Sequence, residues 1–266
     1  MVDKYTSRIA LVLDAPVEDL AAVISAAGRA KDIDRGSPVR GADGAAFEVH
    51  WGGRMQKAVV RALTDDPPHG RALLRAETYI GGDGLVEGMR RQCQLLQGLS
   101  RHLRGRVRGV SDVSAVAERD EAWMNRCAVG AVTIDDAIVV RAEGEGTWWV
   151  RTHGLARFDV PDLELYGLSR AQVPGAEAAI RHVLDQLLRG GIRADLSLPD
   201  GTSLYLVPVL EAWTHVPLDW PGVGRAGQDR GPGLDGPRAS LSVLKPPRLG
   251  RYKKDLAGVI DRLPAV

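Results

Sequence analysis

Residues 147–167 contain the densest group of side chains that could do chemistry, in the stretch TWWVRTHGLARFDVPDLELYG. His153, Asp162 and Glu164 are residue types that move protons, and a histidine oriented by a carboxylate is a common general base. One hypothesis is therefore a hydrolase-type enzyme that uses His153 with Asp162 or Glu164. It requires the three side chains to converge in a shared pocket.

The same stretch also fits a structural corner with a binding rim. Asp162 follows a proline, which is typical of a turn, and Gly154 indicates an unusual backbone angle. Asp162 and Glu164 flank Leu163 in a short predicted strand, and in that arrangement both would face solvent. We favour this interpretation, in which the stretch binds rather than catalyses. The predicted binding residues here are Trp148, Trp149, Arg151, His153 and Phe158.

A run of arginines between Gly84 and Gly109 is a second candidate surface, because only Glu87 carries a negative charge there. Several arginines could contact phosphates, which makes nucleic-acid binding an alternative function. The run lacks the interleaved aromatic residues that stack on bases, so a solvated helix face, or a basic patch for an acidic protein partner, is favoured. The arginines are Arg90, Arg91, Arg101, Arg104, Arg106 and Arg108, and Arg101 and Arg104 are the predicted binding residues among them.

Three other motifs are incomplete. The GGDG junction before a predicted helix has the geometry that cradles phosphate, but no Lys-Ser/Thr pair follows it, and Asp83 is placed to cap the helix. GLSRA, around Ser169, lacks the last glycine of a nucleophile elbow. The sequence contains neither an HExxH motif nor a CxxC pair, so no metal site and no cofactor are predicted.

The composition is that of an ordinary globular protein. The chain has 266 residues and a net charge of +1, so no whole-molecule field draws it to nucleic acid or to a membrane. No apolar run approaches the ~18 residues of a membrane span, and no signal-peptide segment is evident. Cys93 and Cys127 are expected to be reduced, packed thiols. These features predict a cytoplasmic protein and leave its oligomeric state open.

Hydrophobic periodicity predicts an α+β fold with two modules of antiparallel sheet, each carrying helices packed on one side. The predicted modules are 1–115 and 116–216, followed by a Pro/Gly-rich loop over 217–240 and a docked strand and helix over 241–266. Predicted strands include 8–13, 47–51, 71–80, 129–134, 137–142, 147–152 and 240–245, with a hairpin over 192–209. Predicted helices cover 17–27, 85–103, 118–126, 174–190 and 250–263.

The segment VRTHGLARFDVPDLEL resembles a box in bacterial proteins of unknown function, in which T-H-G-(hydrophobic) is followed by F-G-x-P-(D/E)-(L/I)-E. Asp159 stands where that pattern has glycine. The resemblance covers about a tenth of the chain and implies a cytosolic α+β protein of the kind found beside toxin–immunity or stress genes. It supplies no catalytic residues. With no complete catalytic motif, we predict an immunity- or stress-associated module that acts by binding a protein.

Overall fold

The computed structural model describes residues 7–31, 33–39, 45–51, 56–66, 71–80, 84–103, 105–190, 195–223, 238–248 and 251–263. The chain divides into two compact units, Met1–Val139 and Val140–Val266. Residues 116–139, which the sequence placed with the second module, belong to the first unit. Among the described helices, none has the length and apolar character needed to cross a membrane.

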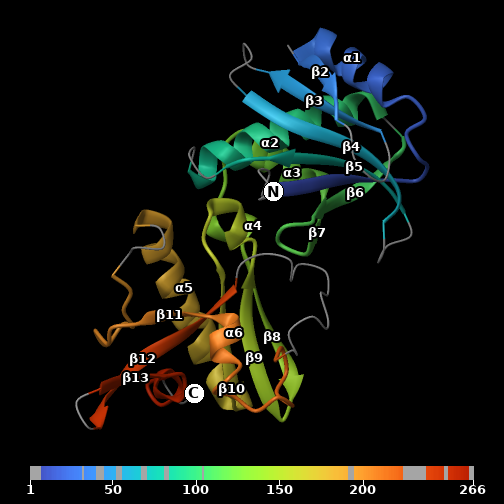
Figure 1. Ribbon diagram of the computed structural model, residues 1–266. Helices are drawn as coiled ribbons and strands as arrows, with labels where there is room; N and C mark the ends of the chain where they lie inside the picture. Colours follow the sequence, from blue (N-terminus) through green and yellow to red (C-terminus); the bar gives the residue numbers. More distant parts are fainter. Residues whose placement is uncertain are drawn as a thin grey trace. The chain divides into compact units, whose positions relative to one another are not determined.

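The first unit is built on a seven-stranded sheet in the order β2-β3-β4-β5-β1-β6-β7 (Figure 1). All of its neighbouring strands are antiparallel. The strands are β1 Ser7–Leu13, β2 Asp34–Pro38, β3 Ala46–Trp51, β4 Gln56–Asp66, β5 Arg71–Thr78, β6 Val107–Asp112 and β7 Ala117–Arg119. The predicted strands 8–13, 47–51 and 71–80 are therefore confirmed to within two residues.

The principal helix of the first unit is α2, Leu85–Ser100, which packs against β1, β5 and α3. One face of it is buried, through Met89, Cys93, Leu96 and Leu99, and the short helix η1, Arg101–Leu103, continues it. Gln92 fixes α2 to the sheet: its amide nitrogen donates to the carbonyl oxygens of Ser7 (3.1 Å) and Ala76 (2.9 Å). Both thiols, Cys93 on α2 and Cys127 on α3, are buried and free of disulfides.

The remaining helices of the first unit correct two predictions. They are α1 Leu20–Lys31, α3 Glu121–Ala128 and α4 Ile134–Ala137. Helix α1 begins three residues later than predicted, because Asp19 caps it by accepting a hydrogen bond from the Ala22 amide (2.8 Å). The predicted strand 129–134 is wrong. Thr133 and Asp136 instead form a capping box that starts α4.

The second unit contains a six-stranded sheet in the order β11-β12-β10-β9-β8, with β13 paired to β12. The strands are β8 Val139–Glu145, β9 Thr147–His153, β10 Asp162–Leu168, β11 Tyr205–Pro208, β12 Arg238–Arg248 and β13 Arg251–Asp255. The α+β class is confirmed, but this sheet is mixed rather than antiparallel, because β10 and β12 run parallel. The expected docking of a C-terminal strand is confirmed by β12, which lies between β10 and β11.

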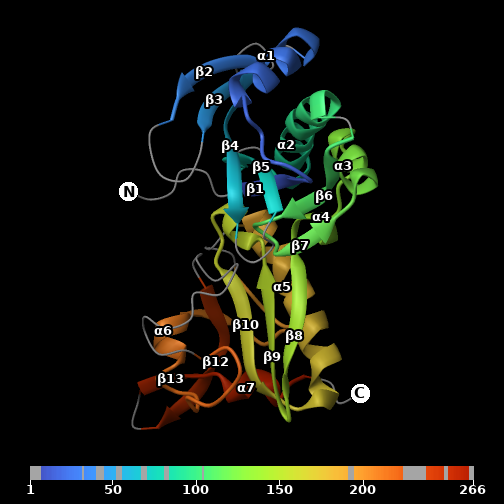
Figure 2. The same ribbon diagram turned by 90° about the vertical axis from the view of Figure 1, so that its right-hand side faces the viewer.

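Helix α5, Val173–Gly190, lies against β9 and β10 (Figure 2). Its predicted stripe of Ala176, Ile180, Val183 and Leu187 is buried. The C-terminal helix predicted over 250–263 is wrong, because 251–255 is strand β13 and only Ala257–Ile260 (α7) is α-helical there. Within the predicted 192–209 hairpin, Ser197 and Ser203 form one isolated bridge, whereas β11 pairs with β12. The other short elements are α6 Val209–Ala212, η2 Leu155–Phe158 and η3 Arg170–Gln172.

Candidate functional site

The stretch singled out in the sequence forms a closed corner between β9 and β10. Asp162 accepts hydrogen bonds from the Thr152 hydroxyl (3.0 Å) and from the Leu155 amide (3.0 Å). Thr152 in turn accepts from the Leu163 amide (2.8 Å). Burial raises the pKa of Asp162 to about 7, although the hydrogen bonds oppose that rise. The carboxyl group of Asp162 therefore holds together the two ends of the corner.

Two residues of the corner have left-handed backbone angles. Gly154 has φ of 108°, and Asp159 has φ of 59°. Glycine favours this region, and aspartate is one of the few other residues that tolerate it. Both residues are therefore of types that suit the tight turn of the corner.

Glu164 is the centre of a buried polar network on β10. Arg238 and the Tyr166 hydroxyl both donate hydrogen bonds to its carboxylate. Trp213 donates from its indole nitrogen to the Tyr166 oxygen at 3.1 Å. Burial raises the pKa of Glu164, while the adjacent Arg238 acts in the opposite direction. The network therefore links β10, β12 and the segment that follows α6.

Trp149 fills the space beside this network. Its ring stacks on that of Tyr166 with centroids 6.1 Å apart and planes within 3°. The guanidinium of Arg151 lies 4.3 Å from the Trp149 ring centroid, a cation–π contact. Arg151 also forms an ion pair with Glu143 at 3.1 Å. Gly222 packs so closely on Trp149 that a Cβ atom there would overlap the ring.

These contacts show where the predicted catalytic residues lie. Glu164 pairs with Arg151 across β9 and β10, and Asp162 bonds to Thr152 and Leu155, which lie on either side of His153 in the chain. His153, Asp162 and Glu164 are only 1%, 6% and 1% exposed, however. The expectation that both acids face solvent is therefore wrong. The two carboxyl groups bind neighbouring side chains and backbone, and none of the three residues lines the cavity described below.

The predicted binding rim is also mostly interior. Trp149, Arg151 and His153 are buried, whereas Trp148 and Phe158 are half-buried. Within the described part of the chain, no cluster of three or more His, Cys, Asp or Glu side chains could hold a metal ion. The corner and its network thus have the contacts of a structural core.

Most described arginines of the predicted basic surface are bound within the first unit. Arg90 and Arg91 both donate to Glu87, at 2.6–2.7 Å, and these contacts, led by the Arg90 hydrogen bond, lower the pKa of Glu87 to about 2. Arg108 pairs with Asp14 at 2.8 Å, and Arg106 donates to backbone carbonyls. Arg101 is exposed and has no ion pair with any described residue. Arg104 and the GGDG residues Gly81–Asp83 lie outside the described residues.

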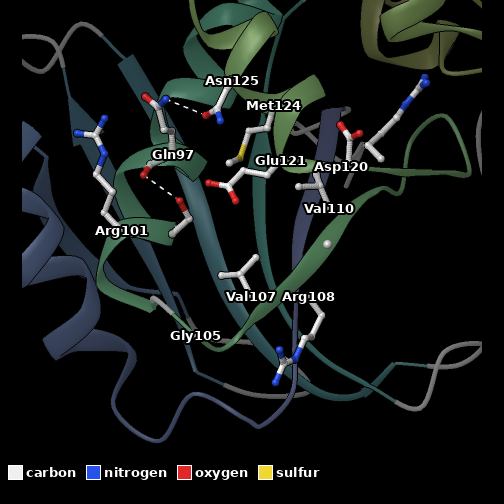
Figure 3. A pocket seen from close by; sticks show the side chains of 13 residues that line it. Gln97, Arg101, Gly105, Val107, Arg108, Val110, Asp120, Glu121, Met124 and Asn125 are labelled. Atoms are coloured by element: carbon white, nitrogen blue, oxygen red, sulfur yellow. Dashed lines mark hydrogen bonds between the residues drawn. The ribbon is translucent and has the colours of Figure 1, made fainter.

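Arg101 borders a cavity of about 460 Å³ in the first unit (Figure 3). Its walls come from the end of α2, from β6 and from the start of α3. The lining residues are Gln97, Ser100, Arg101, Gly105, Val107, Arg108, Gly109, Val110, Arg119, Asp120, Glu121, Met124 and Asn125. We call this cavity the α2–β6–α3 groove. Of its lining residues, the sequence singled out only Arg101 and Arg108, because the groove is formed by elements that meet only in the folded chain.

The chemistry of the groove is mainly polar, with an apolar floor. Figure 3 shows the Glu121 carboxylate and the Val107 side chain pointing into it, whereas Arg101 and Arg108 point outward at its rim. Gln97 donates to the Asn125 side-chain oxygen at 2.9 Å. Glu121 is exposed and forms no ion pair with the residues that the structure describes. The groove therefore offers inside it a carboxylate that no described residue pairs with, and positive charge at its edge.

The groove also lies against an open sheet edge. Strand β7 pairs only with Val110–Asp112 of β6. No other described strand pairs with that side of β6, so among the described strands Val107–Gly109 pair only with β1, and all three residues line the groove. Unpaired backbone groups at such an edge are available to another chain.

Comparison with known proteins adds no assignment: no family model matches the chain, and no curated protein is similar to it. The candidate site therefore rests on the geometry of the groove.

Proposed function

We propose that this protein acts by binding a partner protein through the α2–β6–α3 groove. The observation that supports the proposal is a groove of about 460 Å³ that meets the open edge of β6. Such a site offers backbone hydrogen bonds, an apolar floor and charged side chains together, which is how a peptide segment is recognised. Arg101 retains its predicted role as a binding residue in this proposal, at the rim of the groove.

Neither alternative function has comparable support. A hydrolase built on His153 needs access for its substrate, but His153, Asp162 and Glu164 are buried and the two carboxyl groups are used by the corner and the network. Nucleic-acid binding through the arginine run needs several free cations. Arg90, Arg91 and Arg108 are instead paired with carboxylates of the same unit.

The test is an affinity purification from nuclease-treated lysate of the native cells with three forms of the full chain. The forms are wild type, Arg101→Glu and Arg189→Glu. Arg189 is a matched control, because it is an arginine on α5 in the second unit whose side chain is 82% exposed. We expect a stoichiometric protein with the wild type and with Arg189→Glu, and its loss with Arg101→Glu. Equal recovery with all three forms, or recovery of no protein, would reject the proposal.

A further inference from the structure

The open edge of β6 defines how a partner would be held. We propose that the partner supplies an extended segment that adds as a strand beside Val107–Gly109 and places a basic side chain against Glu121. This inference rests on the proposed function and specifies the chemistry of the partner. Strand addition takes its affinity from backbone hydrogen bonds and its specificity from alternate side chains.

The backbone part of the proposal follows from the unequal lengths of β6 and β7. Strand β6 spans Val107–Asp112, whereas β7 spans only Ala117–Arg119 and pairs with the last three residues of β6. After Arg119 the chain leaves the sheet, because Asp120 caps α3 by accepting from the Trp123 amide at 2.6 Å. Among the described residues, the first half of β6 therefore has no strand paired on that side, where a strand of a partner can add.

A bulge in β6 lies beside Val107, whose apolar side chain points into the groove. Val12 of β1 pairs with Gly109 and Leu13 pairs with Val107, so Arg108 is an extra residue in β6. A bulge of this kind redirects neighbouring side chains. Figure 3 shows the result: Val107 points into the groove and Arg108 points away from it. Gly105 and Gly109, which lack side chains, also line the groove. Around Gly105 a Cβ atom would meet nothing within 4 Å, which leaves room there for a second backbone.

The charge part of the proposal comes from Glu121. Its carboxylate points into the groove from the first turn of α3. Asp120, beside it, already accepts the capping hydrogen bond, so Glu121 is the carboxylate left to bind an incoming group. A lysine or arginine gives a charge-assisted hydrogen bond there, which is stronger than a neutral one. A partner segment with a basic central residue is therefore the occupant that complements the inside of the groove.

The probe is a phage-displayed library of random seven-residue peptides, selected against the full chain. The strongest binder is then synthesised with a fluorescent label in four forms. These are the unmodified peptide, two peptides methylated on alternate backbone nitrogens (one for each register), and a peptide with its basic residue replaced by norleucine. Affinity is measured by fluorescence anisotropy. We expect one methylation register to weaken binding about tenfold or more and the other to have a smaller effect, since only alternate amides face β6.

Variants of the protein test the same contacts from the other side. Glu121→Gln should weaken the unmodified peptide about tenfold and leave the norleucine peptide unchanged. The matched control is Glu145→Gln on β8, an exposed glutamate of the second unit, which should change neither affinity. Gly109→Pro adds a ring to a residue that lines the groove and should weaken binding about tenfold or more, provided that the circular dichroism spectrum is unchanged.

The outcomes separate this inference from the proposed function. If no library peptide is enriched, or if enriched peptides tolerate methylation in both registers and Glu121→Gln, strand addition is wrong. Should the partner protein still be lost with Arg101→Glu in that case, groove binding stands without strand addition. If the partner is retained with Arg101→Glu as well, both proposals fail.

Discussion

Removal of the Glu164 carboxylate should destabilise the second unit more than any surface substitution. In Glu164→Ala, Arg238 loses its carboxylate partner and the Tyr166 hydroxyl loses its acceptor. The Arg238 side chain is only 10% exposed, so water cannot fully replace the lost contact. The variant thus leaves a buried positive charge without its counter-charge.

The expected cost follows from that geometry. Breaking one side of a buried ion pair costs about 3–5 kcal/mol, and a buried hydroxyl without its acceptor costs about 1–3 kcal/mol. The two terms share one carboxylate and do not add fully, so we expect a loss of about 3–5 kcal/mol in the free energy of unfolding. Glu164→Gln, which keeps an acceptor for Tyr166, should cost less than Glu164→Ala.

The assay must report the second unit separately, because a chain with two compact units need not unfold in one step. Urea unfolding followed by hydrogen exchange and mass spectrometry does so, since peptides from β10 and β1 report different units. The matched control is Glu145→Ala, an exposed glutamate at the end of β8 in the same sheet, which should stay within about 0.5 kcal/mol of wild type. A loss below about 1 kcal/mol for Glu164→Ala would refute the structural role assigned to the network.

Two further predictions concern the same unit. Burial raises the pKa of Asp162 to about 7 in the folded protein, against about 3.9 in an unfolded chain. The stabilisation that protonated Asp162 provides is therefore complete below about pH 4 and is lost as the pH rises to 7. The free energy of unfolding of the wild type should fall over that window relative to Asp162→Asn, and parallel pH profiles would contradict this. Gly222 has φ of 76° and contacts the Trp149 ring, whereas Gly201 has φ of 83° and open space around its Cα. In urea titrations Gly201→Ala should lower the free energy of unfolding by about 1–2 kcal/mol through backbone strain alone, and Gly222→Ala should lower it further. Equal losses would show that the Trp149 contact is unimportant.

Elements with local signals could be predicted from the sequence. The apolar stripes of α2 and α5 repeat every three or four residues, and each was recognised because that period is a property of one helix. The corner at 153–162 was also recognised, since glycine and Asx–proline chemistry are local. The overall α+β class follows from the same local patterns.

The role of Glu164 could not be predicted because its partner is distant. Arg238 lies 74 residues further along the chain, on a strand that runs parallel to β10. Without that pairing, an acid that alternates with leucines indicates a solvent-facing side chain. The prediction of a C-terminal helix was wrong for a similar reason. Residues 251–255 have a sequence compatible with a helix, but pairing with β12 makes them a strand. In both cases tertiary contacts override the local pattern.

Asp120 caps helix α3, which carries Glu121 of the proposed binding site. The effect of this cap on binding can be tested. The Asp120 carboxylate starts α3, which ends β7 and carries Glu121 into the groove. Asp120→Ala should cost about 1 kcal/mol of stability, increase exchange of the Trp123 amide and weaken the library-selected peptide, because the turn that positions Glu121 frays. Asp19→Ala is the matched control, since Asp19 caps α1 through the Ala22 amide and should cost similar stability. If both variants weaken the peptide equally, the effect is one of general stability, and the cap does not shape the groove.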